Sequence, residues 1–105
     1  MGSLFVEFFE LGNTAISRKE YEKAVAYYLV CTEIQPDNAR AFYFLARTHA
    51  LAGSRNKALE ALKTAADKGF TGVQELAGKE FEDLRADKRF KEILELVKNN
   101  QSSRQ

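Results

Sequence analysis

The sequence is poor in the residues on which catalysis, metal binding and disulfide bonding depend. Its 105 residues include one histidine, one cysteine and one methionine, and no tryptophan. The single Cys31 has no partner for an internal disulfide, and a metal site needs three or four converging ligands. We therefore predict no catalytic residue, no metal site and no cofactor, and we interpret Cys31 and the single His49 as packing residues.

An excess of one charge and long apolar runs are also missing. Lysine and arginine total 16 while aspartate and glutamate total 15, so the formal net charge is +1. Such a chain has no long-range field to attract nucleic acid or an anionic membrane. No apolar run approaches the roughly 20 residues of a membrane-spanning helix. We expect neither nucleic acid nor membrane as a partner. The compartment stays unknown: a single cysteine fits the cytoplasm, and the periplasm is the alternative for a fragment of a longer secreted chain.

The one proline and six glycines leave most of the chain free to form helices. Its apolar residues repeat at a spacing of 34, so that large side chains align with large ones and small with small. The aligned pairs are Phe8 and Phe42, Leu11 and Leu45, Gly12 and Ala46, Ala24 and Ala58, Tyr28 and Leu62, and Cys31 and Ala65. Small residues let the two helices of a pair approach closely, and such pairs stack because one pair cannot bury both faces.

Start and stop residues divide each unit into two helices. The expected ranges are about 4–16, 20–34, 38–51 and 55–68, with a turn at 17–19. Ser3, Asp37 and Ser54 stand where N-caps are expected, while Pro36 and Gly53 end helices.

These fixed positions resemble the tetratricopeptide repeat. The first unit matches with Phe8, Leu11, Gly12, Ala24, Tyr28, Cys31 and Pro36, and the second with Phe42, Leu45, Ala46, Ala58, Leu62 and Ala65. Three residues depart from the pattern, because Ala15 and His49 replace aromatics and Phe70 replaces the closing proline. The resemblance implies an all-α fold, an α-solenoid of two helix hairpins in a right-handed superhelix fragment.

The spacing fails after Gly69, since Ala58 would fall on Glu92. We expect a short helix near 72–77, a turn at 78–84 and a last helix over 88–99 that Asp87 caps. This stretch resembles the segment that often closes tetratricopeptide groups in bacterial proteins, through Gly69, Phe70, Leu76, Phe81, Leu84, Arg85, Asp87, Arg89 and Phe90. It departs at Lys88, where proline is usual. The cap is expected to cover the open apolar face of the second pair with Phe70, Phe81, Leu84 and Phe90.

The domain organisation follows from these boundaries. We interpret residues 1–3 as a cloning remnant or disordered start, residues 4–99 as one domain, and residues 100–105 as a disordered tail. Within the domain, the repeats occupy about 4–37 and 38–70 and the helical cap about 71–99.

The resemblance also implies a concave groove, lined by the first helix of each pair, that binds a peptide or partner domain. Carried over by position, the groove residues are Phe9, Asn13, Arg40, Tyr43, Phe44 and Arg47, with Val6 and Ile16 beside them. Aromatics mixed with arginines are enriched at protein interfaces. A core role for Phe9 and Phe44 is the alternative. A related function, gripping a chaperone's C-terminal carboxylate, is rejected because Phe9 and Phe44 replace a required lysine and asparagine.

A second function class stays open. The chain could serve as a non-catalytic structural or oligomerisation appendage of a larger bacterial enzyme. Phe5, Phe8 and Phe9 cluster in the first helix, where no preceding repeat covers them, so a homodimer contact is expected there. The acidic clusters at Glu7 and Glu10, and at Glu80, Glu82 and Asp83, are interpreted as solvated faces.

Overall fold

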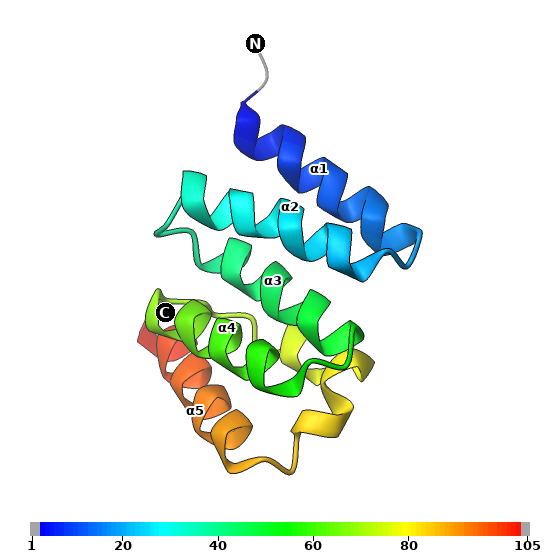
Figure 1. Ribbon diagram of the computed structural model, residues 1–105. Coiled ribbons are helices and arrows are strands. Elements are labelled where there is room, and N and C mark those ends of the chain that lie inside the picture. Colours follow the sequence, from blue (N-terminus) through cyan, green and yellow to red (C-terminus); the bar gives the residue numbers. More distant parts are fainter. Residues whose placement is uncertain (1–2, 104–105) are drawn as a thin grey trace.

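The computed structural model describes residues 3–103 (Figure 1). Over this range it contains five α-helices, two 3-10 helices and no strand, which confirms the predicted all-α class. The α-helices are α1 (Leu4–Ser17), α2 (Tyr21–Ile34), α3 (Ala39–Leu51), α4 (Arg55–Asp67) and α5 (Lys88–Ser103); the 3-10 helices are η1 (Glu75–Ala77) and η2 (Lys79–Leu84). The start and tail expected at residues 1–2 and 104–105 lie outside the described residues.

Successive helices form two hairpins, α1 with α2 and α3 with α4, stacked in chain order (Figure 1). The predicted helical solenoid is therefore confirmed. Gly12 explains the close approach within the first hairpin, because a Cβ at this position would lie 2.5 Å from a ring carbon of Tyr28. In the second hairpin the equivalent Ala46 and Leu62 are both fully buried in the same core, and Leu62 is smaller than the tyrosine at the corresponding position.

Helix starts follow local hydrogen bonding, with one difference from the sequence prediction. The Ser3 hydroxyl accepts a bond from the Val6 amide at 3.1 Å, as expected of an N-cap. The N-cap of α3 is Asn38 rather than Asp37, since the Asn38 Oδ1 accepts from the amides of Arg40 and Ala41 at 3.0 and 3.3 Å. The Asp37 side chain is fully exposed.

Two further capping predictions differ in outcome. Ser54 is the N-cap residue of α4, but its side chain makes no capping bond. Asp87 caps α5 as predicted, because its Oδ1 accepts from the Arg89 amide at 2.8 Å. The Arg89 side chain donates two more bonds to this carboxylate, and these together with the amide bond lower the pKa of Asp87 to about 2.

The C-terminal segment seals the second hairpin. The four residues predicted to cover it are each at most 2% exposed: Phe70, Phe81, Leu84 and Phe90. The rings of Phe81 and Phe90 lie 6.2 Å apart, which joins η2 to α5. The local conformation differs from the prediction, because the short helix is confined to η1 and the expected turn contains η2.

The last helix is longer than predicted. It continues to Ser103, so the expected disordered tail is wrong for residues 100–103. Asn100 supplies the physical reason, because its Nδ2 donates to the carbonyls of Ala66 and Phe70 at 2.8 and 3.0 Å. These two bonds tie the end of α5 to the end of α4.

Candidate binding groove

The predicted groove residues divide into two sets: Phe9, Phe44 and Asn13 lie at the contact between α1 and α3, and Tyr43, Arg40 and Arg47 lie against the C-terminal cap. Phe9 from α1 and Phe44 from α3 meet edge to face, with ring centroids 4.8 Å apart. Both rings also lie 5.8 Å from the buried ring of Tyr28. Both phenylalanines are half-buried, so they pack against each other and remain partly accessible. The alternative that Phe9 and Phe44 are core residues is therefore confirmed in part.

Asn13 borders this aromatic contact and is exposed. The Tyr28 hydroxyl donates to the Asn13 Oδ1 at 2.6 Å. Burial raises the pKa of Tyr28 to about 12, so the phenol remains a protonated donor at physiological pH. Because Tyr28 satisfies the amide oxygen, the amide nitrogen of Asn13 is oriented as a donor. Val6 and Ile16 complete this side, Val6 exposed and Ile16 half-buried.

Tyr43 lies in the second set and is only 5% exposed. Its ring stacks on Phe70, with centroids 4.8 Å apart and planes 12° apart, and lies 6.2 Å from Phe81. Tyr43 is therefore too buried to line an open groove as the sequence predicts, because Phe70 and Phe81 of the C-terminal cap cover this part of α3. Burial raises the pKa of its phenol.

The two groove arginines bind carboxylates of the cap. Arg40 pairs with Glu75 at 2.9 Å and Arg47 with Glu80 at 2.7 Å. Glu80 is therefore not part of a solvated acidic face as predicted; its side chain is 14% exposed. The sequence held no signal for these pairs, because Glu75 and Glu80 lie in the segment where the repeat spacing fails.

Arg40 remains partly available despite its ion pair. Its side chain is 55% exposed, and its guanidinium lies 5.7 to 5.8 Å from the ring centroids of Tyr43, Phe44 and Phe70. A guanidinium at this distance from aromatic faces has a cation–π attraction. Arg40 therefore lies between Tyr43, which the cap covers, and Phe44, which is partly accessible.

The phenylalanines expected at a homodimer contact are half-buried instead of freely exposed. Phe5 stacks on Phe9 at 6.0 Å, and Phe8 lies 6.2 Å from the ring of Tyr27. The large exposed apolar side chains of α1 are Leu4, Val6 and Leu11. The apolar surface of this helix is thus aliphatic rather than aromatic.

The residues most suited to chemistry lie apart from the groove. Burial and the charge of Lys57 lower the pKa of His49, and burial raises the pKa of the Cys31 thiol. A buried thiol with a raised pKa is a poor nucleophile. Within residues 3–103 no three potential ligands gather as a metal site. No helix among those residues is long and apolar enough to cross a membrane.

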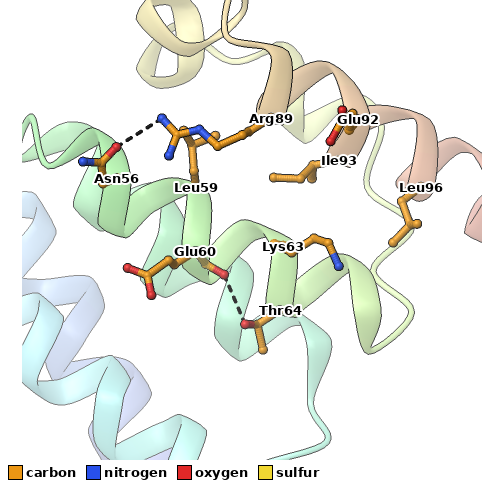
Figure 2. A pocket seen from close by; sticks show the side chains of 9 residues that line it. All are labelled: Asn56, Leu59, Glu60, Lys63, Thr64, Arg89, Glu92, Ile93 and Leu96. Atoms are coloured by element: carbon orange, nitrogen blue, oxygen red, sulfur yellow. Dashed lines mark hydrogen bonds between the residues drawn. The ribbon is translucent and has the colours of Figure 1, made fainter.

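Sequence reasoning missed a cleft of about 550 Å³ between α4 and α5 (Figure 2). Its apolar floor comprises Leu59, Ile93 and Leu96. Figure 2 shows Arg89 reaching from α5 to Asn56 on α4, a bond of 3.1 Å. The other charged groups at its rim are Glu60, Lys63 and Glu92, so the cleft has no single sign of charge. The position of α5 follows no repeat period, which is why the sequence did not indicate it.

Comparison with known families agrees with this arrangement. Residues 8–38 match the family model described as tetratricopeptide repeat. The match covers most of α1, all of α2 and the connection to α3, while the second hairpin and the cap lie beyond it. Such repeats are typically non-catalytic interaction domains. A comparison with curated proteins found no match.

Proposed function

We propose that this chain is a non-catalytic module that binds a protein segment on the face shared by α1 and α3, as the tetratricopeptide match over residues 8–38 and the two stacked hairpins favour. We define the α1–α3 groove as Val6, Phe9, Asn13, Arg40 and Phe44. The single observation that carries the proposal is the contact between Phe9 and Phe44 with Asn13 and Arg40 bordering it. These residues combine an apolar platform, an amide donor and a cation.

This combination suits a short extended segment with one apolar side chain and one carboxylate. The apolar side chain would rest on the Phe9 and Phe44 edges, because aromatic edges and faces supply large contact areas at low entropy cost. The Asn13 amide would donate to a backbone carbonyl of the segment. Arg40 would bind the carboxylate, since arginine is suited to that geometry.

Tyr43 and Arg47, the other two residues carried over from the family, have a different role in this proposal. Tyr43 stacks on Phe70 and Arg47 pairs with Glu80, so both hold the cap against α3. The ligand-binding surface is therefore smaller than the one the sequence predicts. A surface of this size favours weak and reversible binding.

The test begins with peptides selected from a random displayed library on the immobilised chain. Dissociation constants of a selected peptide are then measured for wild type, Asn13→Ala and Arg40→Ala by fluorescence polarisation. Each variant should bind about five- to tenfold more weakly, which corresponds to the loss of about 1 kcal/mol from one hydrogen bond or charge contact.

Two controls separate binding from folding. Glu75→Gln breaks the ion pair of Arg40 while it leaves the guanidinium in place, so it should not weaken binding. Asn99→Ala makes the same substitution as Asn13→Ala at an exposed position of α5. Equal affinity of wild type and Asn13→Ala for every selected peptide would contradict the proposed groove.

A second candidate, a structural appendage of a larger bacterial enzyme, is favoured by the exposed outer face of α1. Leu4 and Leu11 are 62% and 45% exposed. In this case polypeptide upstream of α1 would cover them. A Leu11→Cys, Cys31→Ala chain should react rapidly with a maleimide, and a version extended by the native upstream sequence should react at least about tenfold more slowly. Equal rates in the two versions would exclude the appendage role.

A further inference from the structure

One face of α1 is both apolar and acidic. Leu4, Glu7 and Leu11 are spaced by three and four residues, which places them on the same side of a helix. The helix contains Glu7 and Glu10 and no lysine or arginine. Leu4 and Leu11 are the exposed leucines of this helix. The outer face of α1 therefore suits a surface that is apolar at its centre and basic at its rim.

Such a surface lies at the other end of the chain. Between η1 and α5 there is a hollow of about 340 Å³ whose apolar lining comprises Val73, Leu76, Ala77, Phe90 and Leu94. The charged residues that line it are Arg85, Lys91 and Lys98, and no acidic residue lines it. We call this surface the η1–α5 hollow.

The basic rim is available for a partner. Arg85 is exposed and uses one guanidinium nitrogen to donate to the carbonyls of Ala77 and Gly78. Lys91 and Lys98 are exposed and take part in none of the ion pairs found within residues 3–103. Glu95 lies within one turn of both lysines on α5 but does not line the hollow.

The two other apolar surfaces fit α1 less well. The α4–α5 cleft carries Glu60 and Glu92 at its rim, which would repel an acidic helix. Symmetric pairing of α1 with α1 would bring the Glu7 residues of two copies to the same interface. Like charges placed close together at an interface disfavour association.

The two complementary surfaces belong to α1 and to α5 with η1, and α1 and α5 lie at opposite ends of the stack of helices (Figure 1). They cannot meet within one copy, because the two hairpins separate them. We propose that the outer face of α1 docks in the η1–α5 hollow of a second copy of this chain. The contact is head to tail, so each added copy offers a free surface at either end and the assembly grows as a chain of copies.

This proposal concerns surfaces outside the α1–α3 groove, so it succeeds or fails independently of the proposed function. Its test uses two variants that each remove one side of the contact. The head variant carries Leu4→Asn and Leu11→Asn, and the tail variant carries Lys91→Glu and Lys98→Glu. All four positions are exposed, so folding should be retained, which the thermal melting curve checks.

Sedimentation velocity over a wide concentration range gives the assembly state at low salt. Wild type should grow beyond dimers as its concentration rises, and each variant should remain monomeric. An equimolar mixture of the two variants should form dimers that grow no further, because only the intact head of one and the intact tail of the other can join. Added salt should weaken wild-type assembly, because the charges at the rim are screened.

A third variant controls for net charge. Lys23→Glu with Lys57→Glu changes the charge by the same amount at exposed positions outside the hollow, and should assemble like wild type. Monomeric wild type at every concentration overturns the proposal. So does a wild-type dimer that the tail variant still forms, since this result indicates α1 pairing with α1.

Discussion

At the C-terminal end of the molecule Phe81 is fully buried and Phe90 is 2% exposed, whereas at the N-terminal end Leu4 is 62% and Leu11 45% exposed. A stack of helix hairpins has one apolar face at each end that no further hairpin covers. The chain covers the C-terminal face with η1, η2 and α5. The outer face of α1 stays exposed in residues 3–103, and Glu7 lies on it between Leu4 and Leu11. The comparison shows that, within residues 3–103, burial of large apolar side chains is more complete at the C-terminal end than on the outer face of α1.

The largest expected effect is on the free energy of unfolding, when one residue from each end is replaced by alanine. Phe81→Ala should lower the free energy of unfolding by about 3 to 5 kcal/mol, because it leaves a cavity between Tyr43 and Phe90. Leu4→Ala should change it by less than about 0.5 kcal/mol, since most of the side chain is exposed in the folded state. Urea titrations of both variants measure the difference.

Phe81→Leu provides a milder control in case the alanine variant does not fold. It should cost less than Phe81→Ala because more of the buried volume is kept. Equal stability of Phe81→Ala and Leu4→Ala would show that the cap does not stabilise the second hairpin.

A smaller loss of stability is expected from a substitution between α1 and α2. It tests whether these two helices pack tightly, although the outer face of α1 is exposed. Gly12→Ala should destabilise the chain by about 1 to 3 kcal/mol, because the added Cβ would come within 2.5 Å of the Tyr28 ring. The same substitution usually stabilises a helix by up to about 1 kcal/mol, so the sign of the effect is diagnostic. A raised melting temperature for Gly12→Ala would mean that the ring of Tyr28 moves aside freely.

The ion pairs of the cap should contribute less than its aromatic residues. The pair of Arg47 and Glu80 has less exposed side chains than that of Arg40 and Glu75. A double-mutant cycle on Arg47→Ala and Glu80→Ala should give a coupling free energy of up to about 1 kcal/mol, and the cycle on Arg40 and Glu75 a smaller one. A larger coupling free energy for Arg40 and Glu75 than for Arg47 and Glu80 would contradict the order expected from burial.

The smallest effect is a pH dependence confined to the C-terminal end. The hydrogen bonds from Arg89 lower the pKa of Asp87 from 3.8 to about 2, so the carboxylate stabilises the folded state above pH 3.8 and this contribution is lost as the pH falls through about 2. In the Asp87→Ser variant a hydroxyl that does not titrate in this range caps α5, as Ser3 caps α1. The difference in melting temperature between wild type and Asp87→Ser should therefore disappear near pH 2. A constant difference across this range would show that Asp87 stabilises α5 by another means.

The sequence predicted the parts of the fold that depend on repeat spacing. Gly12 and Tyr28 indicated the close pairing of helices, and Phe81 with Phe90 indicated a sealing cap. It did not predict the burial of Tyr43, because the contacts of Tyr43 with Phe70 and Phe81 come from a segment that follows no period. Arg47 was assigned to a ligand for the same reason, since nothing local to α3 marks Glu80 as its partner.

Helix ends were predictable only where neighbouring residues determine them. Ser3 and Asp87 cap their helices through bonds to amides within three residues. Asp37 and Asn38 are both good capping residues, so their side-chain types alone did not identify Asn38 as the cap. The length of α5 depends on Asn100, whose bonds reach residues 30 and 34 positions earlier in the chain.

Binding of a ligand in the α1–α3 groove is tested by amide chemical shifts during titration with a selected peptide. The amides of Phe9, Asn13 and Phe44 should shift as peptide is added, while those of η2 should keep their positions. Shifts confined to the α4–α5 cleft would contradict the claim. The claim would also be contradicted if the amide chemical shifts of η2 moved to values typical of unstructured chain. In that case the ligand would replace the cap on Tyr43 and Arg47.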